Sequence, residues 1–130
     1  MDISITTDSY TQDRRDWLGS QHGTDAPRSI QLDLTKGFVS GTHYPKGYLK
    51  SGLPLGKVTT SGRYGLYDNA ASDGREVLVG FLFSPVDVRT GGSTTPGANI
   101  LLHCFIAEAR LPVAVDSNGK ADVAGRIIFV

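Results

Sequence analysis

The chain has 130 residues, a length that suits one domain with a modest core. Its 13 basic and 13 acidic side chains cancel, which argues against nucleic acid as a partner because phosphate binding needs an excess of Lys and Arg. The 16 glycines favour many turns over long helices. The composition therefore predicts a small, turn-rich domain whose neutral charge tolerates assembly with other protein chains.

The cysteine count and the apolar runs bear on the compartment. Cys104 is the only cysteine, so an internal disulfide is excluded and a reducing compartment is the simpler inference. Polar residues follow Met1 where a secretory signal would carry a basic and then an apolar stretch. Apolar runs such as residues 77–79 and 127–130 are far too short to span a membrane. We expect a soluble protein made in a cytoplasm, with no membrane partner.

The first 29 residues form the most polar part of the chain. Such a stretch buries too little to offset its ordering entropy, so we expect residues 1–29 to be an extended, mobile arm before a β-rich domain of residues 30–130. Residues 1–35 hold six acids against three arginines, an acidic leader able to dock on its own body or on a neighbour. The candidate contact residues of this arm are its apolar side chains: Ile3, Ile5, Tyr10, Trp17 and Leu18.

Trp17 leaves two alternatives open. Tryptophan is enriched where one protein surface anchors into another, which favours a contact with a partner. The other interpretation is that Trp17 packs on this chain's own body.

Strand signals begin after the arm. Ile30, Leu32 and Leu34 alternate with polar residues, the period of a half-buried strand. Residues 37–52 read as a loop interrupted by glycine and proline, and residues 53–60 and 63–67 as strands. A turn at residues 68–74 leads into residues 77–83, whose continuous apolar character predicts a strand buried on both faces.

The second half of the domain continues this pattern. Residues 89–99 predict a flexible, exposed loop, and residues 100–110 a strand with Cys104 facing inward. Residues 111–115 either extend that strand or form a short edge piece, because Pro112 excludes a central position. A turn at residues 116–119, a helical turn at 120–125 and a final strand at 127–130 complete the chain.

No group of side chains has the spacing of a catalytic or metal site. His22, His43 and His103 lack metal-ligand spacing, and His103 and Cys104 are adjacent, so a strand would place them on opposite faces. Asp68 and Asp73 flank a turn, where Asp commonly binds the backbone two residues on. The glycine-rich pieces lack the Lys and Ser/Thr of a phosphate loop. We predict neither an enzyme nor a bound cofactor.

Basic and aromatic residues interleave in residues 43–50, a pattern that can stack single-stranded nucleic acid. The neutral total charge and the proline favour a surface loop instead. Within this loop, Tyr44 and Tyr48 are the only clustered aromatic side chains that could form a glycan-binding platform.

Residues 52–83 carry an ordered set of positions whose specificity lies in their spacing. These are Gly52, Leu55, Gly56, Lys57, Val58, Thr59, Gly62, Arg63, Tyr64, Tyr67, Asp68, Asp73, Gly74, Val79, Gly80, Phe81 and Leu82. The passage resembles the head decoration (capsid cement) proteins of tailed bacteriophages, the group that includes the lambda decoration protein. Residues 100–111 and 124–130 resemble the last strands of that family, so the resemblance covers residues 36–130.

The resemblance implies a β-clip fold, mainly β with little helix, that assembles as a homotrimer. Such trimers sit on three-fold and quasi-three-fold positions of the expanded capsid and stabilise it against the pressure of packaged DNA. The implied partner is the major capsid protein and the implied location the exterior of the virion. In this family the N-terminal arm becomes ordered on the shell and adds a strand to capsid-protein β-structure. The alternative from another class is a receptor- or glycan-binding β-module of a phage tail or fibre.

Overall fold

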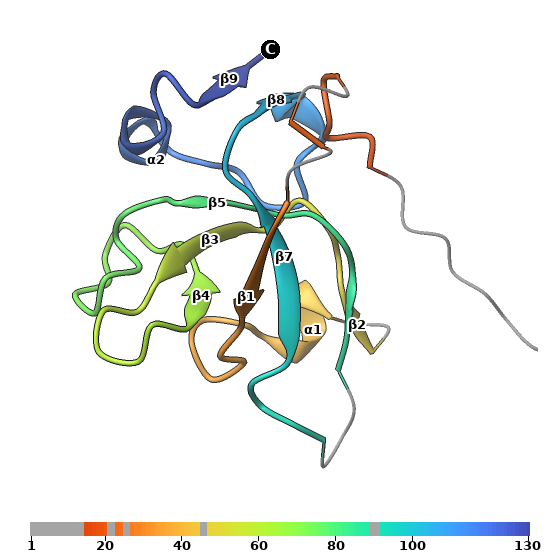
Figure 1. Ribbon diagram of the computed structural model, residues 1–130, viewed down its shortest axis with the longest axis vertical. Helices are drawn as coiled ribbons and strands as arrows, with labels where there is room; N and C mark the ends of the chain where they lie inside the picture. Colours follow the sequence, from red (N-terminus) through yellow and green to blue (C-terminus); the bar gives the residue numbers. More distant parts are fainter. Residues whose placement is uncertain (1–14, 21–22, 25–26, 45–46, 89–91) are drawn as a thin grey trace, which may run out of the picture.

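The structure, a computed structural model, describes residues 15–20, 23–24, 27–44, 47–88 and 92–130. Five strands form one antiparallel sheet in the order β1-β7-β5-β3-β4 (Figure 1). They are β1 (Arg28–Gln31), β3 (Pro54–Lys57), β4 (Tyr64–Leu66), β5 (Gly80–Leu82) and β7 (Gly97–Leu101). Helix in the described ranges is limited to α1 (Ser40–His43), the 3-10 turn η1 (Glu108–Arg110) and α2 (Ser117–Asp122). The predicted fold class, mainly β with little helix, is confirmed.

The main sheet curls until its two edge strands meet at one end. Beyond β1 the chain forms a parallel bridge between Leu32 and Tyr64. The Asp33 N–H donates to the Tyr64 carbonyl at 2.8 Å, and the Leu66 N–H donates to the Lys36 carbonyl at 3.0 Å. The sheet is therefore closed next to β4 and open towards the start of β1.

The core consists of two apolar clusters on opposite faces of the central strands. Phe81 and Leu101 point into the first cluster, whereas their neighbours Leu82 and Ile100 point into the second. Successive side chains of a strand alternate between faces, so adjacent apolar residues in β5 and at the end of β7 let these strands contribute to both clusters. The prediction of a strand buried on both faces is confirmed for Gly80–Leu82.

Two smaller sheets flank the main one. β8 (Cys104–Ile106) pairs in parallel with β9 (Ile127–Phe129), and these strands lie with α2 at the upper end of the molecule in Figure 1. β2 (Tyr48–Leu49) pairs with β6 (Val86–Asp87). Cys104 is buried in the first cluster, as predicted.

Two predicted strands are shorter than expected. β5 begins only at Gly80, and Val77 is half exposed. The Leu78 N–H donates to the Asp122 carboxylate of α2 at 3.0 Å and so is not part of the sheet. The predicted strand at residues 100–110 is wrong as one element, because the chain bends between β7 and β8. Arg126 stabilises this bend by donating to the carbonyls of Val79 and Leu102, each at 3.0 Å.

Four further predictions, two of them loops, also need correction. The predicted loop at residues 37–52 contains α1 and β2, and the predicted loop at 89–99 ends in the first residues of β7. Residues 89–91 lie outside the described residues. Residues 111–115 form neither a strand extension nor an edge strand. The predicted turn and helical turn near residues 116–125 are instead the N-cap and the body of α2.

Candidate interaction surface

Trp17 belongs to the core of this chain. Its side chain is only 2% exposed, and its ring stacks on Phe81 with 6.3 Å between centroids. The indole N–H donates to the Ser51 hydroxyl at 2.9 Å. The structure therefore supports packing on the chain's own body, and Trp17 is corrected from a candidate partner anchor to a core residue.

Gly52 makes room for this tryptophan. Its φ is +86°, a conformation that side chains of L-residues rarely adopt. A Cβ built at Gly52 would lie 2.8 Å from the Trp17 ring. Gly52, a motif glycine, thus accommodates Trp17 from the N-terminal segment. The sequence around either residue does not predict this contact.

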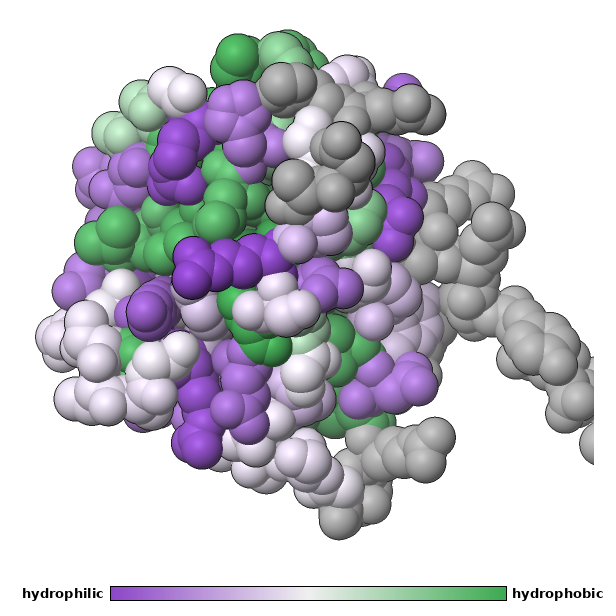
Figure 2. Space-filling model, in the orientation of Figure 1, coloured by the Kyte–Doolittle hydropathy of each residue, from purple (hydrophilic) through white to green (hydrophobic). Residues whose placement is uncertain are grey.

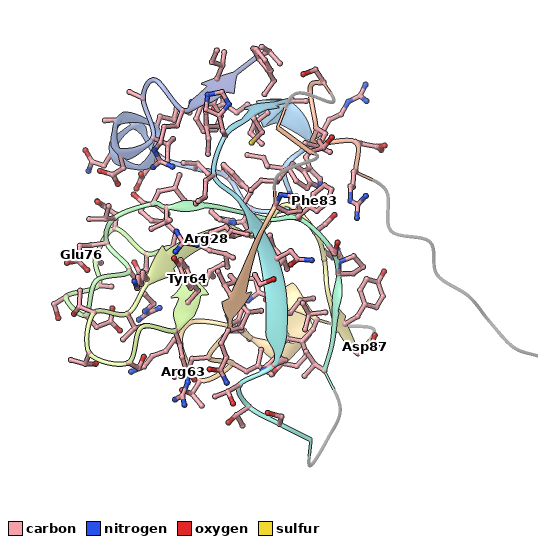
Figure 3. The ribbon with its side chains drawn as sticks, in the orientation of Figure 1. Arg28, Arg63, Tyr64, Glu76, Phe83 and Asp87 are labelled. Atoms are coloured by element: carbon pink, nitrogen blue, oxygen red, sulfur yellow. The ribbon has the colours of Figure 1, made fainter. Side chains whose placement is uncertain are left out.

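Further contacts attach residues 15–19 to the body. Arg15 donates through Nε to the Phe83 carbonyl at 2.8 Å, and its guanidinium lies 4.2 Å from the centroid of the Phe83 ring, labelled in Figure 3. Leu18 is half-buried and bridges to Ile106 of β8. We call residues 15–19 the N-terminal root. The predicted arm residues Ile3, Ile5 and Tyr10 lie outside the described residues.

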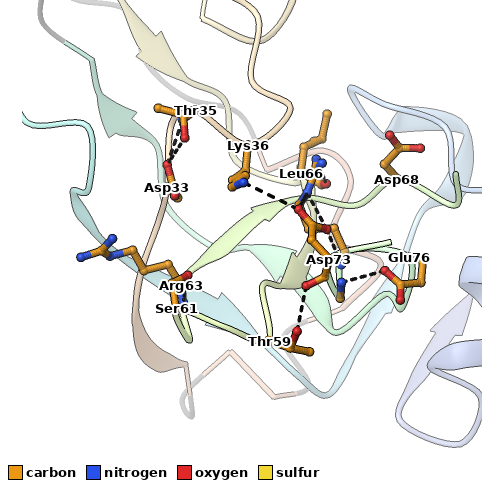
Figure 4. Close-up of polar contacts among 12 residues, drawn as sticks. Asp33, Thr35, Lys36, Thr59, Ser61, Arg63, Leu66, Asp68, Asp73 and Glu76 are labelled. Carbon is orange, nitrogen blue, oxygen red and sulfur yellow. Dashed lines mark hydrogen bonds and ion pairs between the residues drawn. The ribbon is translucent and has the colours of Figure 1, made fainter. Parts of the chain in front are cut away.

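A cluster of polar side chains stabilises the loop between β4 and β5 (Figure 4). Arg75 donates from Nε to the Asp73 carboxylate at 3.0 Å and from Nη1 to the Leu66 carbonyl at 3.3 Å. Although desolvation alone would raise the pKa of Asp73, hydrogen bonds and the charge of Arg75 hold it below its ordinary value. The Ala70 N–H donates to Asp68 at 2.9 Å, so both aspartates bind backbone two residues on, as predicted.

The remaining motif positions lie at close backbone contacts or in the core. A Cβ at Gly56 would lie 2.7 Å from the Arg75 Cα, and one at Gly74 would overlap the Lys57 carbonyl. One at Gly80 would overlap the Leu101 carbonyl. Leu55 is fully buried, whereas Gly62 occupies an open turn. Most of these residues hold the fold together and leave the surface to other positions.

Tyr67 joins the end of β4 to α2. Its hydroxyl donates to Asp116 at 2.7 Å, and the same carboxylate accepts the Gly119 N–H at 2.8 Å as the N-cap of α2. Burial, followed by the hydrogen bond and charge of Asp116, raises the pKa of Tyr67. The hydrogen bond from Tyr67 is the main cause that lowers the pKa of Asp116. This pair positions the helix beside the first core cluster.

The titratable side chains do not converge on a reaction centre within the described ranges. Burial raises the pKa of the Cys104 thiol to about 11, which leaves it protonated and unreactive. Nδ1 of buried His43 accepts the Val39 N–H at 2.8 Å. The described part of the chain shows no group of three or more His, Cys, Asp or Glu able to hold a metal ion. None of its helices is long and apolar enough to cross a membrane.

Apolar side chains reach the surface beside β9. Ile128 is 51% exposed and Val130 is 69% exposed, and Figure 2 shows hydrophobic atoms at this upper end. A hollow of about 510 Å³ adjoins them. Its lining is Glu108, Ala109, Leu111, Ala114 and Val130. We call Ala109, Leu111, Ala114, Ile128 and Val130 the C-terminal apolar surface.

This surface adjoins the N-terminal root. A Cβ built at Gly19 would lie 3.0 Å from a methyl carbon of Val130, and the Gly19 N–H donates to the Phe105 carbonyl at 2.8 Å. Root and apolar surface therefore occupy one end of the molecule. By contrast, Tyr44 and Tyr48 are both half-buried, and Tyr44 packs against the second core cluster.

One family model matches the chain. It is described as bacteriophage lambda head decoration protein D, and it matches residues 36–125, well over half of the sequence. The chain belongs to this family. The predicted family is thereby confirmed, and with it a structural role in decorating a phage capsid and a location on the virion. No curated protein matches the chain.

The matched range includes every motif position from Gly52 to Gly80 and excludes the N-terminal root and β9. The decoration-protein core thus accounts for the glycine contacts around Arg75. Of the two features at the upper end, the root and the residues Ile128 and Val130 lie outside the match, whereas Ala109, Leu111 and Ala114 lie within it.

Proposed function

We propose that this member of the decoration-protein family forms a homotrimer that binds the major capsid protein at three-fold and quasi-three-fold positions of the expanded shell. In this role it stabilises the shell against the pressure of packaged DNA. It is made in the host cytoplasm and adopts the β-clip architecture of its family. The observation that carries the proposal is the family match over residues 36–125.

The capsid-facing end is the one that combines the N-terminal root with the C-terminal apolar surface. Exposed apolar surface on a small soluble domain commonly marks an interaction site. Trp17 and Arg15 fix the root to the body, and Gly19 of the root lies against Val130. Both elements can therefore contact the same partner.

Residues 1–14 supply the arm. Ile3 and Ile5 alternate with polar residues, a pattern that suits addition of a strand to an exposed sheet edge of the capsid protein. Ordering such a segment costs several kcal/mol, so one arm alone binds weakly. Three arms on one trimer make the later contacts intramolecular, and avidity then rises by a factor on the order of 10²–10⁴.

Co-sedimentation with expanded, empty shells tests this assignment. The full chain should pellet with shells, whereas a variant without residues 2–14 and the variant Val130→Asp should remain in the supernatant. Val39→Asp is the matched control, because Val39 is 56% exposed beside α1 at the other end of the molecule. Full binding by both test variants would contradict the proposed orientation, and no binding by the full chain would contradict the function.

The oligomeric state has a separate test. Sedimentation velocity should give a species of three times the 13.9 kDa chain mass. A species of one chain mass at micromolar concentration would refute the trimer.

A further inference from the structure

The open end of the main sheet forms a cleft between its two edges. The cleft has a volume of about 360 Å³ and lies between the start of β1 and the turn that precedes β4. It is lined by Arg28, Ser29, Ile30, Gln31, Lys57, Gly62 and Tyr64. None of the motif contacts described above fills it.

One wall of this cleft is an unpaired strand edge. The Leu32 N–H donates to Pro96, so even-numbered residues of β1 bond towards β7. Odd-numbered residues point the other way, as the bond from Asp33 to Tyr64 shows. Within the described chain, the Ser29 N–H and carbonyl and the Gln31 N–H therefore face the cleft without a backbone partner.

The cleft also carries positive charge. Arg28 and Lys57 are both exposed at its walls, and its lining includes no carboxylate. Figure 3 shows Arg28 beside Tyr64 between β1 and β4. An open strand edge flanked by two cations suits an extended, acidic peptide.

The chain itself contains such a peptide. Residues 2–8 read Asp-Ile-Ser-Ile-Thr-Thr-Asp, with β-branched residues at four positions and an acid at each end. The two acids are opposite in charge to the cations of the cleft. The alternation of apolar and polar residues favours the extended backbone that pairing with a strand edge requires.

The distance between root and cleft is short. Ser29 lies opposite Asn99 in β7, and the Phe83 N–H donates to the Asn99 carbonyl on the far side of that strand. Arg15 is bound to the carbonyl of Phe83. Two strand spacings, about 10 Å, therefore separate Ser29 from Phe83. Residues 9–14 span up to about 20 Å when extended, which is enough to bring residues 2–8 to β1.

We propose that residues 2–8 dock in the cleft of their own chain, pairing with the open edge of β1 and placing Asp2 and Asp8 near Arg28 and Lys57. The tether gives this segment a high effective concentration at the cleft. Capsid binding then requires the segment to leave the cleft.

Hydrogen exchange of the free protein tests the docked state without any shell. In the full chain, the amides of Ser29 and Gln31 should exchange about tenfold or more slowly than in a variant without residues 2–8. The charge reversals Arg28→Glu and Lys57→Glu, introduced together, should remove this protection, and adding Asp2→Lys and Asp8→Lys should restore it. Equal exchange in the full chain and the deletion variant would overturn the proposal.

Crosslinking identifies the chain that supplies the segment. Ser4→Cys and Ser61→Cys introduce two thiols for a short bismaleimide, and Cys104 does not compete because it is buried. Docking within one chain should give a crosslinked product that is one chain in size. A two-chain product would show that a neighbouring copy supplies the segment and would overturn docking within one chain. Since neither experiment contains capsid protein, failure here is distinguishable from failure of the proposed function.

Discussion

Trp17 contributes to the core although it comes from the most polar part of the sequence. Its ring fills the space above Gly52, and its N–H is bound by Ser51. The aromatic ring and the glycine are thus one structural unit formed by residues 35 positions apart. This unit fixes the N-terminal root on the body.

Substitutions of Trp17 test this unit. Trp17→Ala should lower the free energy of unfolding by about 3–5 kcal/mol, because it leaves a cavity in the first core cluster. Trp17→Phe should cost less, since it mainly removes the hydrogen bond to Ser51. Urea unfolding followed by circular dichroism measures both. A loss below about 1 kcal/mol for Trp17→Ala would contradict the core assignment.

His43 makes stability depend on pH. Burial lowers its pKa from the ordinary 6.5, and Nδ1 must be unprotonated to accept the Val39 N–H. A depressed pKa in the folded state contributes stability above the unfolded pKa that is lost as pH falls. We expect the free energy of unfolding to decrease below pH 6.5, by at most about 1.4 kcal/mol per pH unit from this group. Urea midpoints at pH 7.5 and 5.5 should differ less in His43→Gln than in the natural chain; an unchanged difference would exclude His43 as the cause.

At the scale of elements, the sequence predicted the strands that depend on their own residues. The alternation of Ile30 and Leu32 and the apolar run around Phe81 indicated strands that the structure contains. The bend between β7 and β8 depends on Arg126, more than twenty residues away, and so could not be predicted from its own residues. α2 likewise depends on Tyr67 holding the Asp116 cap.

The candidate site was predictable only in part for the same reason. Charge and alternation singled out the N-terminal segment, but the partners that bury Trp17 lie at Ser51 and Phe81. The C-terminal apolar surface was missed because Ile128 and Val130 belong to a run that predicts a buried strand. The run is apolar at every position, so its sequence carries no alternation, and only the structure shows that Ile127 is buried and Ile128 exposed.

Deletions of different length test where the arm ends. Removal of residues 2–14 should leave the unfolding free energy within about 0.5 kcal/mol of the full chain, because the root is kept. Removal of residues 2–19 should lower it by at least the amount expected for Trp17→Ala, about 3 kcal/mol. Thermal and urea unfolding of both variants measure these differences in the free energy of unfolding. Equal stability of the two deletions would place the end of the arm beyond residue 19, in agreement with the arm of residues 1–29 that composition predicts.

At the scale of the molecule, the two core clusters stabilise different parts of the fold. The second cluster lies inside the curled sheet, and the first joins that sheet to α2, β8 and β9. The N-terminal root and the C-terminal apolar surface both belong to the end built on the first cluster. The exposed apolar side chains Ile128 and Val130 give this end of the molecule the character of a binding surface.

The central claim is that this family member stabilises a phage head by binding its expanded shell. The most direct measurement is the temperature at which empty, expanded shells rupture, followed by light scattering with and without saturating protein. We predict a higher rupture temperature for decorated shells, and no increase when residues 2–14 are absent. Identical rupture temperatures with and without the full chain would contradict the claim.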